Sequence, residues 1–425
     1  MWPVAYMLAS ANWHYRSRRA ASVGLRLLVV TVLSSAFDVP AAAQGTLNYP
    51  QWRGQQRDGA GSGFTQPKSW PKALTRRWKV EVGEGYATPL VIEDTLYVFT
   101  RRGENEMMIG LDAETGAELW RSSYPAQYSP GRPAAAHGAG PKATPLYYEG
   151  KLFTLGISGI VSAFDARTGK LLWQTPPPAE HPFFSAASSP LGEKGLVIVH
   201  PGNYGPLTAF DSNTGEIKWT AGSAGFFASP IIVTLGGTRQ VVSATQDSII
   251  GVSLDGHVLW RHPWEGGGGS TTPVLNGETI IVSALDKGVT ALRPALHDGT
   301  WVVEPVWKTT AVSMYVSNPV VVADTLFGLS HRARGQFFAL DAKSGEVLWL
   351  GQPREADNAA LVKNADLLFL LNDDAELIVA KASRSGFEPI VRYIVADSAT
   401  WAQPTISGNR IFVRDVSSLS LWTFD

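Results

Sequence analysis

The 425-residue sequence contains no cysteine. Disulfide bonds, thiolate catalysis, cysteine-ligated zinc, c-type haem attachment and an N-terminal lipid anchor on cysteine are therefore excluded. Charged residues make up only 17% of the chain, and the formal net charge is −1. Nucleic acids and anionic membrane surfaces attract proteins that carry a basic stripe, so we expect neither as a main partner.

Long apolar runs are also scarce. The run "LLVVTVLSSAF" near the N-terminus is shorter than the roughly 20 residues that a membrane span needs. Four arginines between positions 16 and 26 precede or enter it, and "AAAQ" offers small residues at Ala41 and Ala43. This pattern is typical of an export signal. We predict that residues 1–43 are a signal peptide cleaved near Ala43, and that the protein is periplasmic or secreted without a membrane span.

What the sequence does contain is a repeat. The phrase "LDAETGAELW", residues 111–120, returns as "FDARTGKLLW", "FDSNTGEIKW", "LDGHVLW" and "LDAKSGEVLW". Aligned on their last aromatic residue, the units are 41 to 53 residues long. The aligned tryptophans are Trp78, Trp120, Trp173, Trp219, Trp260, Trp307 and Trp349, and Tyr393 fills the next position.

A small or polar residue before proline recurs at the start of seven units, as in "ATP", "SSP", "TTP" and "SNP", and each unit contains four short apolar runs separated by turns. Four strands per 40–50 residues, repeated, are typical of a β-propeller blade. The count predicts an all-β, eight-bladed propeller of four-stranded antiparallel blades. The last blade has three strands of its own, so we expect residues 75–80 to complete it and close the ring.

The domain organisation follows from this count. We predict a single propeller domain over residues 75–425, preceded by a Gly/Pro-rich lead-in, residues 44–74, that crosses one face of the ring. In each turn, Asp caps the backbone and Gly116 or its equivalent supplies a positive φ. The tryptophan then lies on the outer strand, where it wedges between neighbouring blades. We therefore expect a structural role for the seven tryptophans.

The tryptophan phrases resemble the repeat of the PQQ-binding-like propellers, the quinoprotein alcohol dehydrogenase-like family. The resemblance covers about residues 50–425, and "YPQWRGQQRDGAGSG" resembles a segment that precedes the propeller in secreted bacterial members. It implies a propeller fold for either a quinone-dependent dehydrogenase or a scaffold that binds no quinone. The dehydrogenases typically have adjacent cysteines and a calcium site of Glu, Asn and Asp; this chain lacks the cysteines, and no such constellation can be carried over.

Candidate binding residues lie in the loops between the second and third strands of each blade and in the connections between blades. Both sets of loops emerge on one face of a propeller. "HRAR", residues 331–334, suits an anionic ligand or is simply solvated, and Arg101 has acidic neighbours with which to pair. The predicted binding residues are Arg101, His137, His200, Tyr204, His331, Arg332, Arg334, Trp401 and Arg414.

Two functions remain open at this point. The favoured one is a secreted, monomeric, non-catalytic binding or scaffold protein that takes a protein, peptide or glycan on its loop face, with no catalytic or metal-binding residues and no cofactor. The alternative is a PQQ-dependent dehydrogenase that holds the quinone and calcium on the same face. Neither "HExxH" nor "GxSxG" occurs, so these zinc-protease and α/β-hydrolase motifs are absent.

Overall fold

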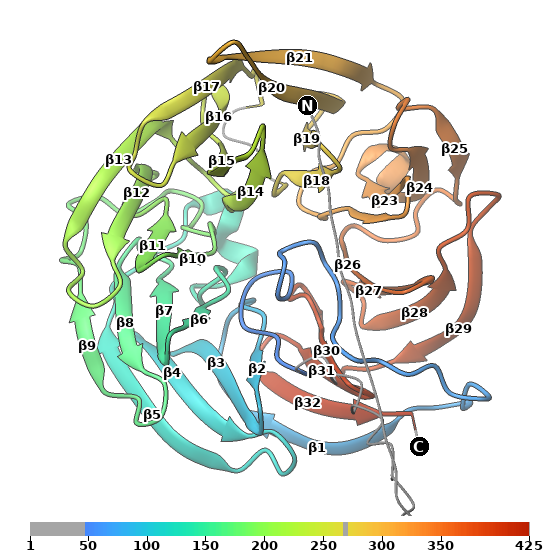
Figure 1. Ribbon diagram of the computed structural model, residues 1–425. Coiled ribbons are helices and arrows are strands. Elements are labelled where there is room, and N and C mark those ends of the chain that lie inside the picture. Colours follow the sequence, from blue (N-terminus) through green and yellow to red (C-terminus); the bar gives the residue numbers. More distant parts are fainter. Residues whose placement is uncertain (1–46, 267–270, 425) are drawn as a thin grey trace, which may run out of the picture. The chain divides into compact units, whose positions relative to one another are not determined.

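A computed structural model describes residues 47–266 and 271–424. The predicted signal peptide, its cleavage near Ala43 and the first three residues of the lead-in lie outside the described residues. Within the described part, the chain forms eight four-stranded antiparallel sheets arranged as a ring (Figure 1). The predicted all-β, eight-bladed propeller is confirmed.

The first four blades follow the order of the sequence. Blade 1 contains β2 (Leu90–Ile92), β3 (Thr95–Arg102), β4 (Asn105–Asp112) and β5 (Glu118–Pro125). Blade 2 contains β6 (Leu146–Tyr148), β7 (Lys151–Leu155), β8 (Val161–Asp165) and β9 (Leu171–Gln174). Blade 3 contains β10 (Leu191–Glu193), β11 (Leu196–Val199), β12 (Pro206–Asp211) and β13 (Ile217–Ala224). Blade 4 contains β14 (Ile231–Leu235), β15 (Thr238–Ala244), β16 (Ser248–Ser253) and β17 (Val258–Pro263).

The remaining blades continue in the same way. Blade 5 contains β18 (Val274–Asn276), β19 (Thr279–Ala284), β20 (Gly288–His297) and β21 (Thr300–Thr309). Blade 6 contains β22 (Val320–Val322), β23 (Thr325–Ser330), β24 (Gln336–Asp341) and β25 (Val347–Leu350). Blade 7 contains β26 (Ala359–Asn364), β27 (Leu367–Asn372), β28 (Glu376–Lys381) and β29 (Glu388–Ile394). Blade 8 contains β30 (Thr405–Ser407), β31 (Arg410–Arg414) and β32 (Ser418–Thr423). Two 3-10 turns, η1 (Arg132–His137) and η2 (Arg332–Arg334), lie in connecting loops.

The outermost strand of blade 8 comes from the other end of the domain. β1 (Thr75–Glu81) pairs antiparallel with β32, so the sheet order is β1-β32-β31-β30. Trp78 lies opposite Leu421 in this pairing, and Glu81 lies opposite Ser418. The strand expected from residues 75–80 is therefore present at the edge of the last blade.

The hydrophobic core lies between adjacent blades. Phe99 of blade 1 packs in one cluster with Leu152 and Phe164 of blade 2. The repeated tryptophans add a polar link at the rim: the indole Nε1 of Trp173 donates to the carbonyl of Ser212 in the next blade (3.2 Å). Trp78, Trp219, Trp307 and Trp349 donate in the same way to Ala113, Leu254, Ala342 and Ser383.

The proline-preceding residues, for which the sequence suggested only a strand start, form a second set of links nearer the centre. The backbone N–H of Thr88 donates to Thr144 Oγ1 (3.1 Å), and that of Thr144 donates to Ser189 Oγ (3.0 Å). Each bond joins one blade to the next. We call the equivalent residues of the eight blades the polar belt: Thr88, Thr144, Ser189, Ser229, Thr272, Asn318, Asn358 and Gln403.

The first part of the lead-in lies inside the ring, where Figure 1 shows it in blue beside the inner strands. Its backbone pairs with blade 1 at Tyr49, with blade 7 at Gly61 and with blade 8 at Ser62. Its side chains reach other blades: Trp52 donates to Thr272 Oγ1 (3.0 Å), and Arg53 donates to the carbonyl of Pro319 (2.6 Å). The segment 47–63 is thus a plug held by blades on opposite sides of the channel, which puts its residues next to the polar belt.

Candidate functional site

One face of the ring carries both sets of loops named above, and we call it the loop face. The connections between blades are bonded there to the loops between second and third strands. The backbone N–H of Phe184 donates to Tyr204 Oη (2.8 Å), and that of Thr400 donates to the carbonyl of Asp373 (3.0 Å). The expected juxtaposition of the two sets of loops is therefore present, with each set supporting the other.

A cavity of about 440 Å³ opens among the inter-blade connections. This volume falls in the range of small-ligand sites in proteins. Its floor includes Trp52 of the plug together with Asn318, Asn358 and Gln403 of the polar belt. The wall residues are Tyr86, Ala134, His137, Lys142, Phe184, Ser185, Ala187, Phe227, Tyr315, Val316, Asp357 and Trp401.

Aromatic side chains dominate two sides of this cavity. On one side, the His137 ring meets Trp401 edge to face, with 4.6 Å between ring centroids, and Tyr86 packs against both. On the other side, Phe184 packs edge to face against Phe183 at 4.9 Å and also contacts Phe227. Such rings offer flat apolar surfaces on which apolar or aromatic groups pack.

Charge in the cavity is sparse. Burial lowers the pKa of Lys142 to about 8, so its amine is a weaker base than that of an ordinary lysine. Burial, and then the nearby Lys142 charge, lowers the pKa of His137, so its imidazole is neutral at pH 7. Asp357 is exposed at the rim. The walls are therefore mainly apolar, with one cation and one carboxylate.

The structure brings only part of the predicted set together. His137 and Trp401 lie in contact and line the cavity. Tyr204 lies behind the cavity wall, packed on Phe226 at 4.6 Å, and its hydroxyl holds the Phe184 backbone. Tyr204 therefore positions a wall residue.

Three predicted binding residues prove to be interior. Arg414 is fully buried and donates to the carbonyl of Phe99 (2.6 Å) and to Thr100 Oγ1 (2.9 Å). Arg101 is also buried and donates to the carbonyl of Gly103 (2.8 Å). Loop position alone made these cations look accessible, but short loops leave long side chains folded back onto backbone carbonyls. Arg101 and Arg414 are therefore buried and not exposed on the loop face, and their role as binding residues stays a prediction.

His200 is buried for a different reason. Its Nδ1 faces the carbonyl of Gly205 (3.0 Å) and must donate, so Nε2 accepts from Ser243 Oγ (2.8 Å). Burial lowers the pKa of His200 to about 4, which keeps the ring neutral. His200 links blade 3 to blade 4 and is likewise not exposed to a ligand.

The "HRAR" loop stays outside the cavity. His331 bonds to the carbonyl of Ser313 (2.8 Å) and to Asp286 (2.9 Å). Arg332 donates to the carbonyl of Thr310, and Arg334 is exposed. These three residues are on the loop face but are not among the lining residues, so their role as a binding site stays a prediction.

The residues that sequence reasoning missed are those of the floor. Trp52 comes from the lead-in, which was expected to cross a face but not to furnish a site. Asn318, Asn358 and Gln403 belong to the polar belt. Its members other than Asn358 stand before proline, and this recurrence was visible in the sequence. Had that recurrence been interpreted as a ring of inward-facing side chains, it would have located the base of the cavity.

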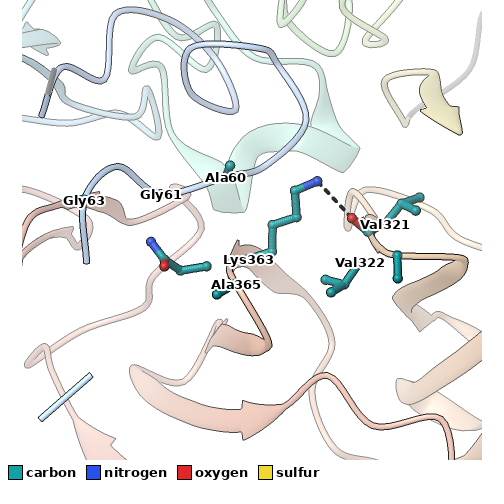
Figure 2. A pocket seen from close by; sticks show the side chains of 9 residues that line it. Ala60, Gly61, Gly63, Val321, Val322, Lys363 and Ala365 are labelled. Carbon is teal, nitrogen blue, oxygen red and sulfur yellow. Dashed lines mark hydrogen bonds between the residues drawn. The ribbon is translucent and has the colours of Figure 1, made fainter. Parts of the chain in front are cut away.

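A further cavity, of about 380 Å³, lies beside the lead-in and is shown in Figure 2. It is lined by Ala60, Gly61, Gly63, Val321, Val322, Ala323, Lys363, Asn364 and Ala365. Its one cation is already paired, since Lys363 Nζ donates to the carbonyl of Val321 (2.8 Å) and forms an ion pair with Asp58 (2.8 Å). This groove therefore offers little to recognise a ligand, and the cavity on the loop face is the better candidate.

Comparisons with known proteins agree with this fold. The architecture is that of a quinoprotein-type β-propeller. A family model described as "Outer membrane protein assembly factor BamB" matches residues 104–351, which is more than half of the chain, and the chain belongs to that PQQ-repeat family.

Two kinds of relative are found. The chain is 26% identical over 309 residues to the dehydrogenase subunit of a quinone alcohol dehydrogenase from Komagataeibacter europaeus, covering 61% of this chain but 39% of that protein. It is 22% identical over 329 residues to the outer membrane protein assembly factor BamB of Yersinia pestis, covering 72% of this chain and 68% of that protein. The chain thus spans well under half the length of its quinone-dependent relative.

Solved structures divide in the same way. BamB from Moraxella catarrhalis superimposes with a TM-score of 0.61 at 18% identity, covering 83% of this chain and 98% of that one. A europium-containing methanol dehydrogenase superimposes with a TM-score of 0.62 at 14% identity, covering 88% and 98%. These similarities establish the fold and leave the choice between the two functions to the site.

The residues of the site do not fit a calcium-bound quinone well. Calcium takes six to eight oxygen ligands, usually with several carboxylates. Asp357 is the one carboxylate among the lining residues. The amide oxygens of Asn318 and Asn358 already accept from the Thr272 backbone (2.7 Å) and Ser317 Oγ (2.7 Å). Across residues 47–266 and 271–424, no group of three or more His, Asp or Glu side chains could hold a metal ion.

No helix in these same described residues is long and apolar enough to cross a bilayer.

Proposed function

We propose that the protein is a periplasmic or secreted non-catalytic binding protein, which takes an apolar segment of a polypeptide into the loop-face cavity. The carrying observation is the cavity itself, with aromatic walls supplied by connections from several blades and closed below by the plug. Phe184 and Phe227 offer apolar rings without polar side-chain atoms, and apolar side chains of a polypeptide pack on such surfaces.

The rim of the cavity supports the same function. Phe183, Phe184 and Tyr315 are 56%, 41% and 43% exposed. Exposed aromatic groups that continue into a concave, apolar site are typical of surfaces that bind another chain. The related assembly factors are named for outer membrane protein assembly, and membership of the same family supports a protein ligand here as well.

Calorimetry with two synthetic peptides tests the proposal. We expect Ac-Gly-Phe-Gly-Phe-Gly-NH₂ to bind and Ac-Gly-Ser-Gly-Ser-Gly-NH₂ not to bind. Trp401→Ala should weaken the first peptide at least tenfold, because it removes the ring that His137 and Tyr86 pack against. Trp301→Ala is the matched control. It changes a half-buried tryptophan on the outer strand β21, outside the cavity lining, and this variant should bind the peptide as the unaltered protein does. Equal binding of both peptides would contradict the proposal.

The alternative, a quinone-dependent dehydrogenase, is favoured by the relatives that carry that activity. Its test is an absorption spectrum after incubation with PQQ and calcium, followed by gel filtration. Retention of the quinone at one equivalent per chain, with loss in Trp401→Ala, would support a quinoprotein and contradict a polypeptide ligand at this cavity.

A further inference from the structure

A third, much smaller cavity of about 30 Å³ adjoins the loop-face cavity. The two share Trp52, Val316, Asn318, Asn358, Trp401 and Gln403 among their lining residues, and Arg53 lines the smaller one. A volume of this size accommodates one or two waters or a group of three heavy atoms. The small cavity is therefore an extension of the main one, with Arg53 among its lining residues.

Arg53 is fully buried, yet its hydrogen bonds are incomplete. Its Nε donates to the carbonyl of Arg57 (3.2 Å), and its Nη2 donates to the carbonyl of Pro319 (2.6 Å). Its Nη1 is buried without a hydrogen-bond partner among the described residues. Carbonyl oxygens hold the guanidinium in place, and one N–H pair remains to be satisfied.

The charge of Arg53 is only partly offset nearby. Its closest acidic influence is Asp58, whose carboxylate is 2.8 Å from the ammonium of Lys363. Arg57, also fully buried, adds a second positive charge that repels Arg53. Neither arginine forms an ion pair with any residue that the structure describes. Buried charges in proteins are normally paired, so this part of the channel is poised to receive a negative one.

The surrounding amides suit an anion as well. Asn318 Nδ2 donates to the carbonyl of Val316 (3.3 Å), and Gln403 Nε2 donates to the carbonyl of Leu361 (3.2 Å). Each amide nitrogen carries a second hydrogen. The lining of the small cavity thus combines one cation with amide donors and contains no carboxylate.

We propose that this small cavity is a carboxylate site, in which Arg53 Nη1 binds the carboxylate of a ligand whose apolar part lies in the loop-face cavity. A planar three-atom carboxylate is small enough to enter a cavity of this size. The proposal deepens the proposed function, and only its peptide arm rests on that function. The carboxylate comes either from the C-terminus of a polypeptide or from a small organic acid.

The first arm uses formate, which is small enough to enter without occupying the main cavity. We expect sodium formate to raise the melting temperature saturably in low-salt buffer, and formamide to leave it unchanged. Arg53→Gln should weaken the apparent affinity for formate at least tenfold. Arg334→Gln removes an exposed charge from the same face and should leave that affinity as it is, so general salt effects cancel in the comparison.

Several outcomes of this arm would overturn the carboxylate site. Equal effects of formate and formamide on the unaltered protein would do so, and this comparison needs no variant if Arg53→Gln fails to fold. The carboxylate site would also be overturned if a folded Arg53→Gln protein still bound formate. The same holds if Lys142→Gln lost formate binding while Arg53→Gln kept it. In the latter case the cation in the main cavity wall would be the anion site.

The second arm identifies the source of the carboxylate by calorimetry. Gly-Gly-Phe with a free C-terminus is compared with Gly-Gly-Phe-NH₂, and phenylacetate is compared with phenylacetamide. A tenfold preference for the free acid in the peptide pair assigns the site to a polypeptide C-terminus, and a preference only in the second pair assigns it to small organic acids. Binding of acid and amide alike leaves the proposed function standing and removes the carboxylate site. If formate binds and no aromatic probe does, the carboxylate site stands and the proposed function is removed.

Discussion

The rim and the centre of the ring are built by different rules. At the rim, one phrase is used again and again: an indole such as that of Trp173 packs on the turn of the next blade and donates to its carbonyl. In the centre, the cavity is assembled from inter-blade connections that differ in sequence and from a plug that occurs once. Repetition serves assembly, and the unique segments carry the candidate site.

Blade 4 shows that even the rim tolerates exceptions. Trp260 is only 4% exposed, but its Nε1 donates to Gln240 Oε1 within its own blade (2.6 Å). The connection that follows contains the run of glycines at 266–269. Where the link to the next blade changes, the tryptophan keeps its burial and finds a different acceptor, since a buried indole N–H needs one.

The strongest test of this comparison removes the segment that belongs to both regions. A chain that begins at residue 83 loses the plug and also β1, the outermost strand of blade 8. We expect the melting temperature to fall by more than about 10 °C, because an open sheet edge and an unfilled channel both destabilise the ring. A chain that begins at residue 64 keeps β1 and should be less affected. If the chain that begins at residue 83 melted within a degree or two of the chain that begins at residue 64, the ring would close without β1.

A single tryptophan at the rim should cost less than the deletion but more than one in the centre. Trp307 is 9% exposed, and its Nε1 donates to the carbonyl of Ala342 (3.0 Å). Trp307→Ala should lower the free energy of unfolding by about 3–5 kcal/mol, as large-to-small changes in cores do. Trp401→Ala, in the open cavity, should cost clearly less in urea unfolding. A larger loss for Trp401 would make the centre, and not the rim, the stabilising region.

The repeated turn can be tested with two glycines of nearly equal conformation. Gly169 and Gly150 have φ values of 72° and 74°. A Cβ at Gly169 would lie 2.3 Å from Trp120 Cε3, whereas one at Gly150 has no neighbour within 4 Å. Gly150→Ala should cost only the left-handed backbone strain, about 1–2 kcal/mol. Gly169→Ala should lower the free energy of unfolding further, because it also displaces the Trp120 indole. Equal losses in the two variants would show that the contact with Trp120 does not contribute.

The smallest expected effect concerns the aspartate of the turn. The Arg384 guanidinium, 2.7 Å from Asp341 Oδ2, and backbone N–H groups of the turn lower the pKa of Asp341 to about 2. Since the folded pKa lies below the usual value near 4, this stabilisation is full above pH 4 and disappears as the pH falls to about 2. Asp341→Asn should therefore cost under about 1 kcal/mol at pH 7, because the group is partly exposed. Its melting temperature should converge with that of the unaltered protein near pH 2, and a constant difference would mean that the charge is not involved.

Much of the rim could be predicted because its information is local. Hairpin turns need Asp and Gly at set offsets, outer strands need a large flat side chain, and both recur in the sequence at the blade period. The pairing of residues 75–80 with the last three strands followed from counting strands, since a sheet edge left unpaired is unfavourable. Burial of Trp260 and Trp307 needed no knowledge of distant residues.

The site could be predicted only in part. His137 and Trp401 were among the expected residues because inter-blade connections converge on one face. Arg101, His200 and Arg414 were not distinguishable from accessible side chains, because their burial depends on carbonyl groups brought close by folding. Trp52 and Arg53 lie hundreds of residues from the partners that they meet in the channel.

By itself, the sequence determined the class of fold, the number of blades and the role of the repeated turn, because hydrophobic period and turn chemistry act between near neighbours in the chain. Only the tertiary structure decided which side chains face the cavity and which are buried with internal hydrogen-bond partners. It also decided that the lead-in enters the channel and leaves the Arg53 guanidinium buried beside an apolar cavity. Such placements depend on closing the ring, which brings residue 53 against residue 319 and residue 86 against residue 401.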